Sequence, residues 1–183
     1  EFAGLRSVQT ALLAGFDLRT PLIAAVNGHA RAGGFDLMLA AELRVAVPSA
    51  TFALEEVALG LYPTGNATVL LPRQIGWVHA HELLLTAKPI DASRACEIGL
   101  VNRVVAPTEL LPVCLALARD MATCVPDVLP KYKRLIDEGY ALPFGEAMRL
   151  EARRSIEHAR SVTPEAIESR RAGIQQRGRS QTE

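Results

Sequence analysis

The sequence predicts an α/β fold with a C-terminal helical region. Over residues 1–105, short apolar runs typical of buried strands alternate with segments of helical length and spacing. From residue 106 to residue 183 the pattern predicts helices and no further strand. These observations divide the chain into an α/β core, 1–105, and a helical region, 106–183, for which we expect a role in oligomerisation.

Composition and charge exclude several classes of protein. The 183 residues carry 20 Lys and Arg against 20 Asp and Glu, so no strong field favours nucleic acid or an anionic membrane surface. No apolar run approaches the roughly 18 residues of a membrane span. Cys96, Cys114 and Cys124 lack metal-ligand spacing and indicate reduced core residues. We therefore expect a cytoplasmic protein that binds no metal and no separate cofactor.

The first elements surround a turn that contains glycines. Apolar residues at helical spacing predict a helix over about 1–13, and the apolar run 21–28 ends in Asn-Gly, which predicts a strand that enters a turn. A helix is predicted over 33–43, directly after this turn. A tight turn between a strand and a helix favours glycine.

The rest of the core continues the alternation. Strands are predicted at 43–47, 51–54 and 100–105, and helices at 67–76, 77–87 and 90–99. Asp91 is the expected N-cap of the last of these helices, and Gly99 is expected to end it. In the helical region, Thr163 and Pro164 have the residue types of an N-cap and a first helical position.

The glycine turn and the helix behind it form the first candidate site. At Gly33 and Gly34 the first N–H groups of a helix have no intrahelical acceptor, and together with the helix dipole they favour an anion or a polarised carbonyl oxygen. Asp36 adds a carboxylate in the same helical turn. Close packing of the turn would explain the glycines equally well, so both interpretations stay open on these residues alone.

A second pair of acids favours the chemical interpretation. Glu55 and Glu56 follow the strand 51–54, and strand alternation would place them on opposite faces, one inward and one solvated. A loop with glycine and proline comes next, and a new helix is predicted to begin near Thr64. An inward carboxylate close to Asp36 and to a helix N-terminus would suit acid–base chemistry at a carbon alpha to a carbonyl group.

Four separated motifs occur in a characteristic order. They are A-V-N-G at 25–28 followed by the glycine pair, F-x-x-x-E-x-x-L-G-x-x-P at 52–63, L-P-R-x-I-G at 71–76 and A-x-x-x-G-L-V-N-x-V-V at 95–105. With these motifs the sequence resembles the crotonase (enoyl-CoA hydratase/isomerase) superfamily from about residue 21 to residue 105, and the helical tail fits in outline. The resemblance implies a spiral of ββα units, an acyl-CoA thioester substrate that includes its coenzyme A, and a homotrimer or hexamer.

The resemblance also implies a role for each candidate residue. Gly33 would donate one of two backbone N–H groups to the thioester oxygen. Asp36 and Glu56 would hold a water and add it across the α,β double bond, and Thr64 and Gly65 would help to position that water. Three further residues of the glycine turn are expected to line the substrate site: His29, Ala32 and Gly34. The implied activity is that of an enoyl-CoA hydratase, a lyase of fatty acid metabolism.

Three alternatives follow from the same resemblance. An enoyl-CoA isomerase would need only Glu56 as a proton shuttle. A carnitinyl-CoA dehydratase-like enzyme is favoured by the segments G-G-F-D-L and T-F-A-L-E-E. A catalytically silent acyl-CoA-binding protein is the alternative from another class, since no feature of the sequence alone requires turnover.

The chain departs from the family pattern at several positions. Hydratases usually carry Glu where this chain has Asp36; a dienoyl-CoA isomerase subgroup uses Asp there but pairs it with a second Asp at the position of Thr64, which disfavours that subgroup. Glu55 stands where the family usually has proline. The family segment that supplies the other oxyanion N–H and contacts the adenine lies before the first residue given, and we expect it to belong to a longer protein.

Overall fold

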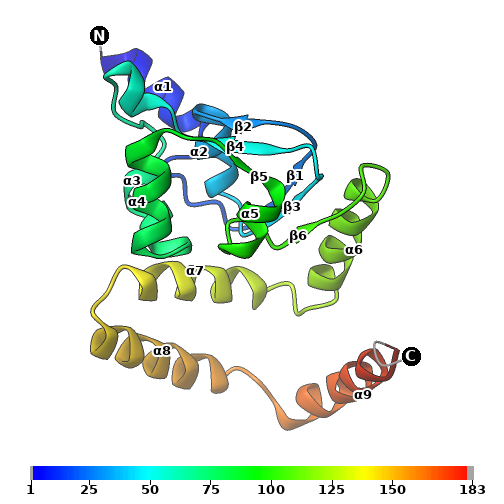
Figure 1. Ribbon diagram of the computed structural model, residues 1–183. Helices are drawn as coiled ribbons and strands as arrows, with labels where there is room; N and C mark the ends of the chain where they lie inside the picture. The colour runs from blue at the N-terminus through cyan, green and yellow to red at the C-terminus, as the bar shows by residue number, and fades with distance from the viewer. Residues whose placement is uncertain (1, 181–183) are drawn as a thin grey trace. The chain divides into compact units, whose positions relative to one another are not determined.

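The described strands form two small sheets, and the first four alternate between them along the chain (Figure 1). The computed structural model describes the backbone of residues 2–180 and the side chains of residues 7–171 and 173–175. Strands β1 (Ile23–Val26), β3 (Leu43–Ala46) and β6 (Arg103–Val104) form one parallel sheet in the order β1-β3-β6. In the register of β1 and β3, Ile23 lies opposite Leu43 and Val26 lies opposite Ala46, so the two strands pair over their full length.

The second sheet determines where the candidate residues meet. It contains β2 (Ala30–Arg31), β4 (Thr51–Ala53) and β5 (Ile90–Asp91), with β2 parallel and β5 antiparallel to β4. Since the carboxyl ends of two parallel strands lie at the same edge of a sheet, the segments that follow β2 and β4 begin side by side. The strands β1 and β2, and again β3 and β4, enter different sheets before the chain turns into helix, as expected of a spiral of ββα units.

The helices fall into two compact units of the chain, Glu1–Pro130 and Lys131–Glu183. In the first unit, α6 contacts β1 and β3, so this unit extends past the expected 1–105 core. The second unit contains α8 and α9, and α7 begins shortly before the boundary. The helices are α1 (Phe2–Ala11), α2 (Gly33–Leu39), the 3₁₀ helix η1 (Glu56–Leu59), α3 (Ala67–Gln74), α4 (Trp77–Thr86), α5 (Ala92–Glu97), α6 (Leu110–Ala122), α7 (Leu129–Tyr140), α8 (Phe144–Ala159) and α9 (Pro164–Ser180).

The core of the first unit lies among the two sheets and the helices between them. Its largest fully buried apolar side chains come from α2, β3, β4, α3, the residues directly after β3 and β4, and the segment before β6. Burial of such side chains is the main favourable contribution to folding. They are Phe35, Phe52, Leu39, Leu54, Leu71, Leu100, Val45 and Val47.

Two expected helix starts have the predicted caps. The Asp91 side chain accepts a hydrogen bond of 2.8 Å from the Arg94 N–H at the start of α5. The Thr163 hydroxyl accepts one of 3.3 Å from the Ala166 N–H, directly before Pro164 opens α9. Gly99 has a φ of 77° after α5, as expected of a residue that ends a helix.

Tertiary pairing changes several expected boundaries. Ala30–Arg31 and Ile90–Asp91 were expected in the glycine turn and in a helix, but each pairs with β4. Strands of two residues show no periodicity in a sequence, so only the partner strand defines them. The helix expected near Thr64 begins at Ala67, after Asn66 with a φ of 70°.

The positive φ angle of the glycine turn belongs to an alanine. Ala32 has φ 45° and ψ −124°, whereas Gly33 and Gly34 both lie outside the positive-φ region. The expectation that backbone conformation explains these glycines is therefore wrong. At Gly33 the constraint is packing instead, because a Cβ there would lie 3.3 Å from the Cδ2 atom of Leu12.

Candidate active site

Asp36 is a buried carboxylate at the N-terminal end of α2. Its side chain is 2% exposed, and its Oδ2 atom accepts a hydrogen bond of 3.1 Å from the Gly65 N–H. Its Oδ1 atom is buried and has no hydrogen-bond partner within the described residues. Buried polar atoms of native proteins usually have a partner, so this oxygen is available to a water or a substrate group.

Glu56 supplies the second carboxylate and begins η1. Its Oε2 atom is also buried without a hydrogen-bond partner among the residues that the structure describes. Burial raises the pKa of Asp36, the charge of Glu56 raises it further, and the Gly65 hydrogen bond partly offsets both effects. Two interacting carboxyl groups with unpaired oxygens are an arrangement suited to proton transfer.

Glu55 and Glu56 have different environments, but the alternation of side chains along a strand is not the cause. Strand β4 ends at Ala53, and Glu55 is the N-cap residue of η1. The Glu55 Oε1 atom accepts a hydrogen bond of 2.9 Å from the guanidinium of Arg31 on β2, and both side chains are partly exposed. Glu55 is therefore solvated, as expected, and it is also paired with Arg31. Glu56 has a buried oxygen. A 3₁₀ turn after the strand produces this difference.

Gly65 allows the loop before α3 to approach Asp36 closely. A Cβ atom at Gly65 would lie 2.3 Å from the Cβ atom of Asp36, a separation that real side chains do not adopt. Glycine is required here by close approach, and Thr64 precedes it as a half-buried residue. The structure thus brings the loop residues 64–65 to the carboxylate pair.

The N-terminus of α2 presents backbone donors next to these acids. The carbonyl oxygen of Ala32 accepts from the N–H groups of Phe35 and Asp36, while the N–H of Ala32 donates to Ala53. Gly33 and Gly34 occupy the first two helical positions, whose N–H groups have no intrahelical acceptor. Gly33 is half-buried and Gly34 is exposed, so both can be reached from outside the helix.

A comparison with known protein families identifies the family of the chain. The family model described as enoyl-CoA hydratase/isomerase matches residues 5–175. The chain belongs to the enoyl-CoA hydratase/isomerase family. The crotonase resemblance of the sequence is thereby confirmed.

Individual members of the enoyl-CoA hydratase/isomerase family are similar over much of the chain. A carnitinyl-CoA dehydratase of Citrobacter koseri is 34% identical over 178 residues, 96% of this chain and 66% of that protein. A carnitinyl-CoA dehydratase of Proteus mirabilis is 36% identical over 149 residues, 77% of this chain and 54% of that protein. The chain thus spans roughly half to two thirds of the length of these curated relatives.

A solved structure supports the same fold assignment. The enoyl-CoA hydratase of Bacillus anthracis aligns with a TM-score of 0.83 and 31% sequence identity, over 94% of this chain and 66% of that one. This likeness covers both the strand-containing part and much of the helical region, as the crotonase fold requires.

His29 lies away from the carboxylate pair of this family member. Its Nδ1 atom is 2.7 Å from the hydroxyl of Thr51, and its side chain is exposed. Both residues stand at the start of the strands β2 and β4, whereas Asp36 and Glu56 follow the ends of these strands. Of the expected substrate-site residues, the structure brings Ala32, Gly33, Gly34, Thr64 and Gly65 near the acids and leaves His29 at the opposite edge.

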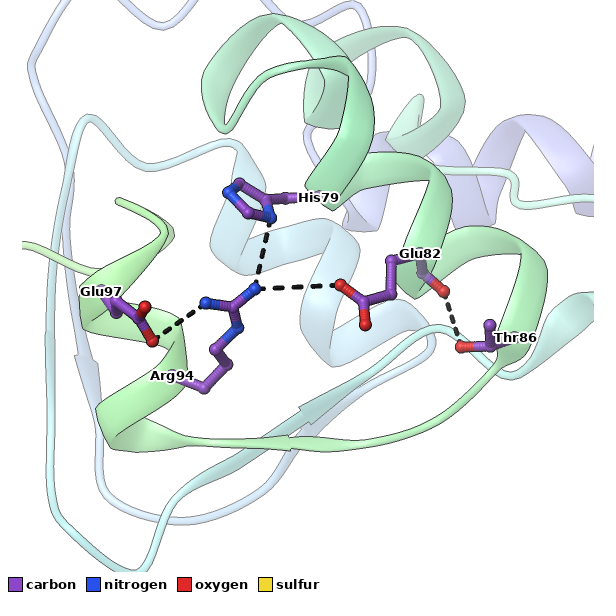
Figure 2. A network of polar contacts seen from close by, with 5 residues as sticks. All are labelled: His79, Glu82, Thr86, Arg94 and Glu97. Atoms are coloured by element: carbon purple, nitrogen blue, oxygen red, sulfur yellow. Dashed lines mark hydrogen bonds and ion pairs between the residues drawn. The ribbon is translucent and has the colours of Figure 1, made fainter.

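Two other histidines make surface contacts. The Nδ1 atom of His79 on α4 lies 3.4 Å from the guanidinium of Arg94 on α5, which also pairs with Glu82 at 3.8 Å and Glu97 at 2.9 Å (Figure 2). His81 stacks on Trp77 with a centroid separation of 4.0 Å. The contacts of Arg94 with His79 and Glu82 join α4 and α5, and none of these contacts involves the candidate acids.

Sequence reasoning missed a buried arginine. Arg44 on β3 is 7% exposed, and its guanidinium donates to backbone carbonyls at the C-terminal end of α2. Gln74, the last residue of α3, takes part in the same group of hydrogen bonds. The available signal was a single charged residue inside the otherwise apolar run 43–47.

The side chains that the structure describes form no group of three His, Cys, Asp or Glu residues placed to hold a metal ion. None of the described helices has the length and apolar character of a membrane span.

Proposed function

We propose that the chain carries the carboxylate acid–base centre of an enoyl-CoA hydratase. The observation that supports this most directly is the juxtaposition of Asp36 and Glu56, each with a buried oxygen that lacks a partner in the described part of the chain. We propose that one water molecule is hydrogen bonded to both of these oxygens. The family to which the chain belongs and its similarity to the enoyl-CoA hydratase of Bacillus anthracis agree with this chemistry.

In the proposed reaction, both carboxyl groups orient the water while the substrate is polarised from the other side. The N–H of Gly33 hydrogen bonds the thioester oxygen and stabilises the negative charge that develops there. The water oxygen forms a bond to Cβ as the double bond opens, the Glu56 carboxylate accepts the proton that the water loses, and Glu56 delivers that proton to Cα. The proton that the water loses balances the proton that Cα gains, so Asp36 and Glu56 end in their initial states.

The raised pKa of Asp36 has a use in this scheme. A protonated carboxyl group can donate a hydrogen bond to the water oxygen, whereas an ionised one can only accept. The neighbouring charge of Glu56 favours that protonated form of Asp36. The two acids are therefore suited to different tasks, with Glu56 as the group that exchanges the proton.

Dehydration of a 3-hydroxyacyl-CoA is the second candidate function. The relatives of Citrobacter koseri and Proteus mirabilis are named carnitinyl-CoA dehydratases. Loss of water is the reverse of the reaction above and would use the same two acids, so the site geometry fits both directions. Carnitinyl-CoA, with its cationic acyl group, would in addition need a complementary surface in the acyl pocket.

The deciding experiment assays the full-length protein on three thioesters. Crotonyl-CoA tests hydration, a 3-enoyl-CoA tests double-bond migration, and carnitinyl-CoA tests dehydration. We expect hydration of crotonyl-CoA. Migration without hydration would favour an isomerase that uses Glu56 alone, and binding without turnover would favour a silent acyl-CoA-binding protein.

Two substitutions separate the roles of the acids. Glu56→Gln should lower kcat by about 10²–10⁴-fold in hydration and in any isomerisation, because a positioned general acid–base is lost. Asp36→Asn should reduce hydration more than isomerisation, since only hydration needs the oriented water. Near-normal kcat in Glu56→Gln would contradict the assignment, and circular dichroism checks that each variant is folded.

A further inference from the structure

Helices α2 and α3 are joined by hydrogen bonds at both ends. At their N-terminal ends the Oδ2 atom of Asp36 accepts from the Gly65 N–H, 3.1 Å away, in the loop before α3. At their C-terminal ends the Nε2 atom of Gln74 donates to the carbonyl of Leu39 over 3.2 Å. The contact between the carboxylate and the loop therefore depends on how the two helices are held at the opposite end.

Arg44 holds that opposite end from the sheet. Its Nη2 atom donates to the carbonyls of Leu39 and Ala41, both at 3.0 Å, and to the Oε1 atom of Gln74 at 2.8 Å. Its Nε atom donates to Met38 at 3.0 Å, and Nη1 to Leu100 at 3.1 Å. One planar guanidinium thus links β3, the end of α2, the end of α3 and the segment before β6.

The charge of Arg44 is suited to this place. The last carbonyls of a helix carry partial negative charge, and a cation there is stabilising. Burial lowers the pKa of Arg44 to about 10, while Glu42 opposes the effect, so the guanidinium remains protonated at neutral pH. The side chain of Gln74 then uses both ends of its amide, accepting from Arg44 and donating to Leu39.

The short helices transmit a displacement from one end to the other. With seven residues in α2 and eight in α3, their lengths are roughly 10 and 12 Å at about 1.5 Å per residue. At Gly65 there is no spare room, because even a Cβ atom would lie 2.3 Å from Asp36. A small change of the helix pair at Arg44 and Gln74 would therefore alter the contact between Asp36 and Gly65.

We infer that Arg44 and Gln74 are a positioning pair for the carboxylate centre. They fix the C-terminal ends of α2 and α3 and thereby set the placement of Asp36 against the Gly65 loop. The consequence for turnover rests on the proposed hydratase function, whereas the consequence for the Gly65 hydrogen bond does not. If the pair only stabilised the core, its loss would lower stability without a selective effect at Asp36.

The test uses Gln74→Met, because it keeps a side chain of similar length and removes both hydrogen bonds of the amide. Gln74 is exposed in part, so this change is compatible with folding, whereas removal of Arg44 would leave several buried carbonyls without donors. The matched control is Arg94→Met, which breaks the polar contacts between α4 and α5 in Figure 2. That control does not touch α2, α3 or Gly65.

We expect Gln74→Met to lower kcat for crotonyl-CoA hydration by about three- to tenfold at nearly unchanged KM. The amide of Gly65 should also exchange its hydrogen faster, as measured by NMR, while amides in α4 and α5 stay protected. Gln74→Glu, which keeps an acceptor for Arg44, should recover part of both effects. Arg94→Met should leave kcat and the exchange of Gly65 unchanged.

The exchange measurement separates two kinds of failure. A wild-type chain without hydratase activity would contradict the proposed function, and the exchange of Gly65 would still report on the positioning pair. If Gln74→Met and Arg94→Met have the same kcat and the same Gly65 exchange rate, the positioning role is wrong. An equal loss of protection over the whole first unit would assign Gln74 to general stability and would also overturn the inference.

Discussion

Asp36 combines burial, a neighbouring carboxylate and one backbone donor, and these determine how its ionisation affects stability. Its pKa is raised in the folded state above the ordinary value of 3.8. At pH values between the two pKa values, the folded chain binds a proton at Asp36 that the unfolded chain does not. The free energy of unfolding therefore decreases as pH rises through this interval, because the folded state must give up a proton that it binds more tightly.

Asp36→Asn removes this titration while keeping an oxygen that can accept from Gly65. We expect the variant to gain stability relative to the wild type as pH rises above the ordinary value of 3.8 and through the raised pKa of Asp36, because the wild type must then ionise a buried carboxyl group and the variant need not. Urea denaturation of both proteins at several pH values measures the difference. A difference that does not change with pH would show that Asp36 has the same pKa in both states.

At the scale of the element, α2 presents backbone N–H groups at one end and has its carbonyls bound by Arg44 at the other. Gly33 is the first residue of α2, a position that tolerates proline because its N–H has no intrahelical partner. Its φ lies outside the positive region, so substitution there is not excluded by backbone strain. A substitution at Gly33 can therefore remove this N–H donor while α2 is retained.

Gly33→Pro deletes that donor and should lower kcat by about 10²–10³-fold, the usual effect of losing one oxyanion donor. Gly33→Ala is the matched control, since it retains the N–H and only moves the Cδ2 atom of Leu12, 3.3 Å from the added Cβ, by a small amount. Hydration kinetics and circular dichroism of both variants provide the measurement. Equal rates in folded Gly33→Pro and Gly33→Ala would exclude the backbone donor.

At the scale of the whole molecule, exposed apolar side chains on the helical region favour association. Tyr132, Ile136 and Tyr140 follow each other at intervals of four residues on α7 and are 64%, 64% and 59% exposed. On α8, Phe144 is 81% and Met148 58% exposed. With equal numbers of acidic and basic residues, the chain has little net charge to resist assembly. Such surfaces commonly mark subunit contacts.

We expect the full chain to form a trimer or a dimer of trimers, as the family resemblance implies. Ile136→Glu should shift sedimentation equilibrium at micromolar concentration toward the monomer, because a charge would be buried in the contact. Lys131→Glu, an exposed change on the same helix, is the control. An active monomer of the unsubstituted protein would contradict the expected assembly.

The sequence by itself predicted most of the helices and the longer strands in their order and proposed the two candidate acids. Caps such as Asp91 and Thr163 act on backbone within three residues, so their residue types suffice to predict them. The strand around Val45 and the helix that carries Phe35 have apolar runs whose length and spacing are local properties. Asp36 and Glu56 were proposed from sequence motifs. A motif gives the residue types and their spacing along the chain, but not their arrangement in space.

Only the tertiary structure decided how these residues are placed. The parallel pairing of Ala30–Arg31 with β4 brings the two acids to one edge of a sheet, yet two residues contain no pattern that predicts a strand. The approach of Gly65 to Asp36 and the hydrogen bonds of Arg44 to Leu100 and Gln74 join residues that are 29, 56 and 30 positions apart. Such contacts depend on which surfaces the packed core brings together, and this is a property of the whole chain that no local stretch of sequence contains.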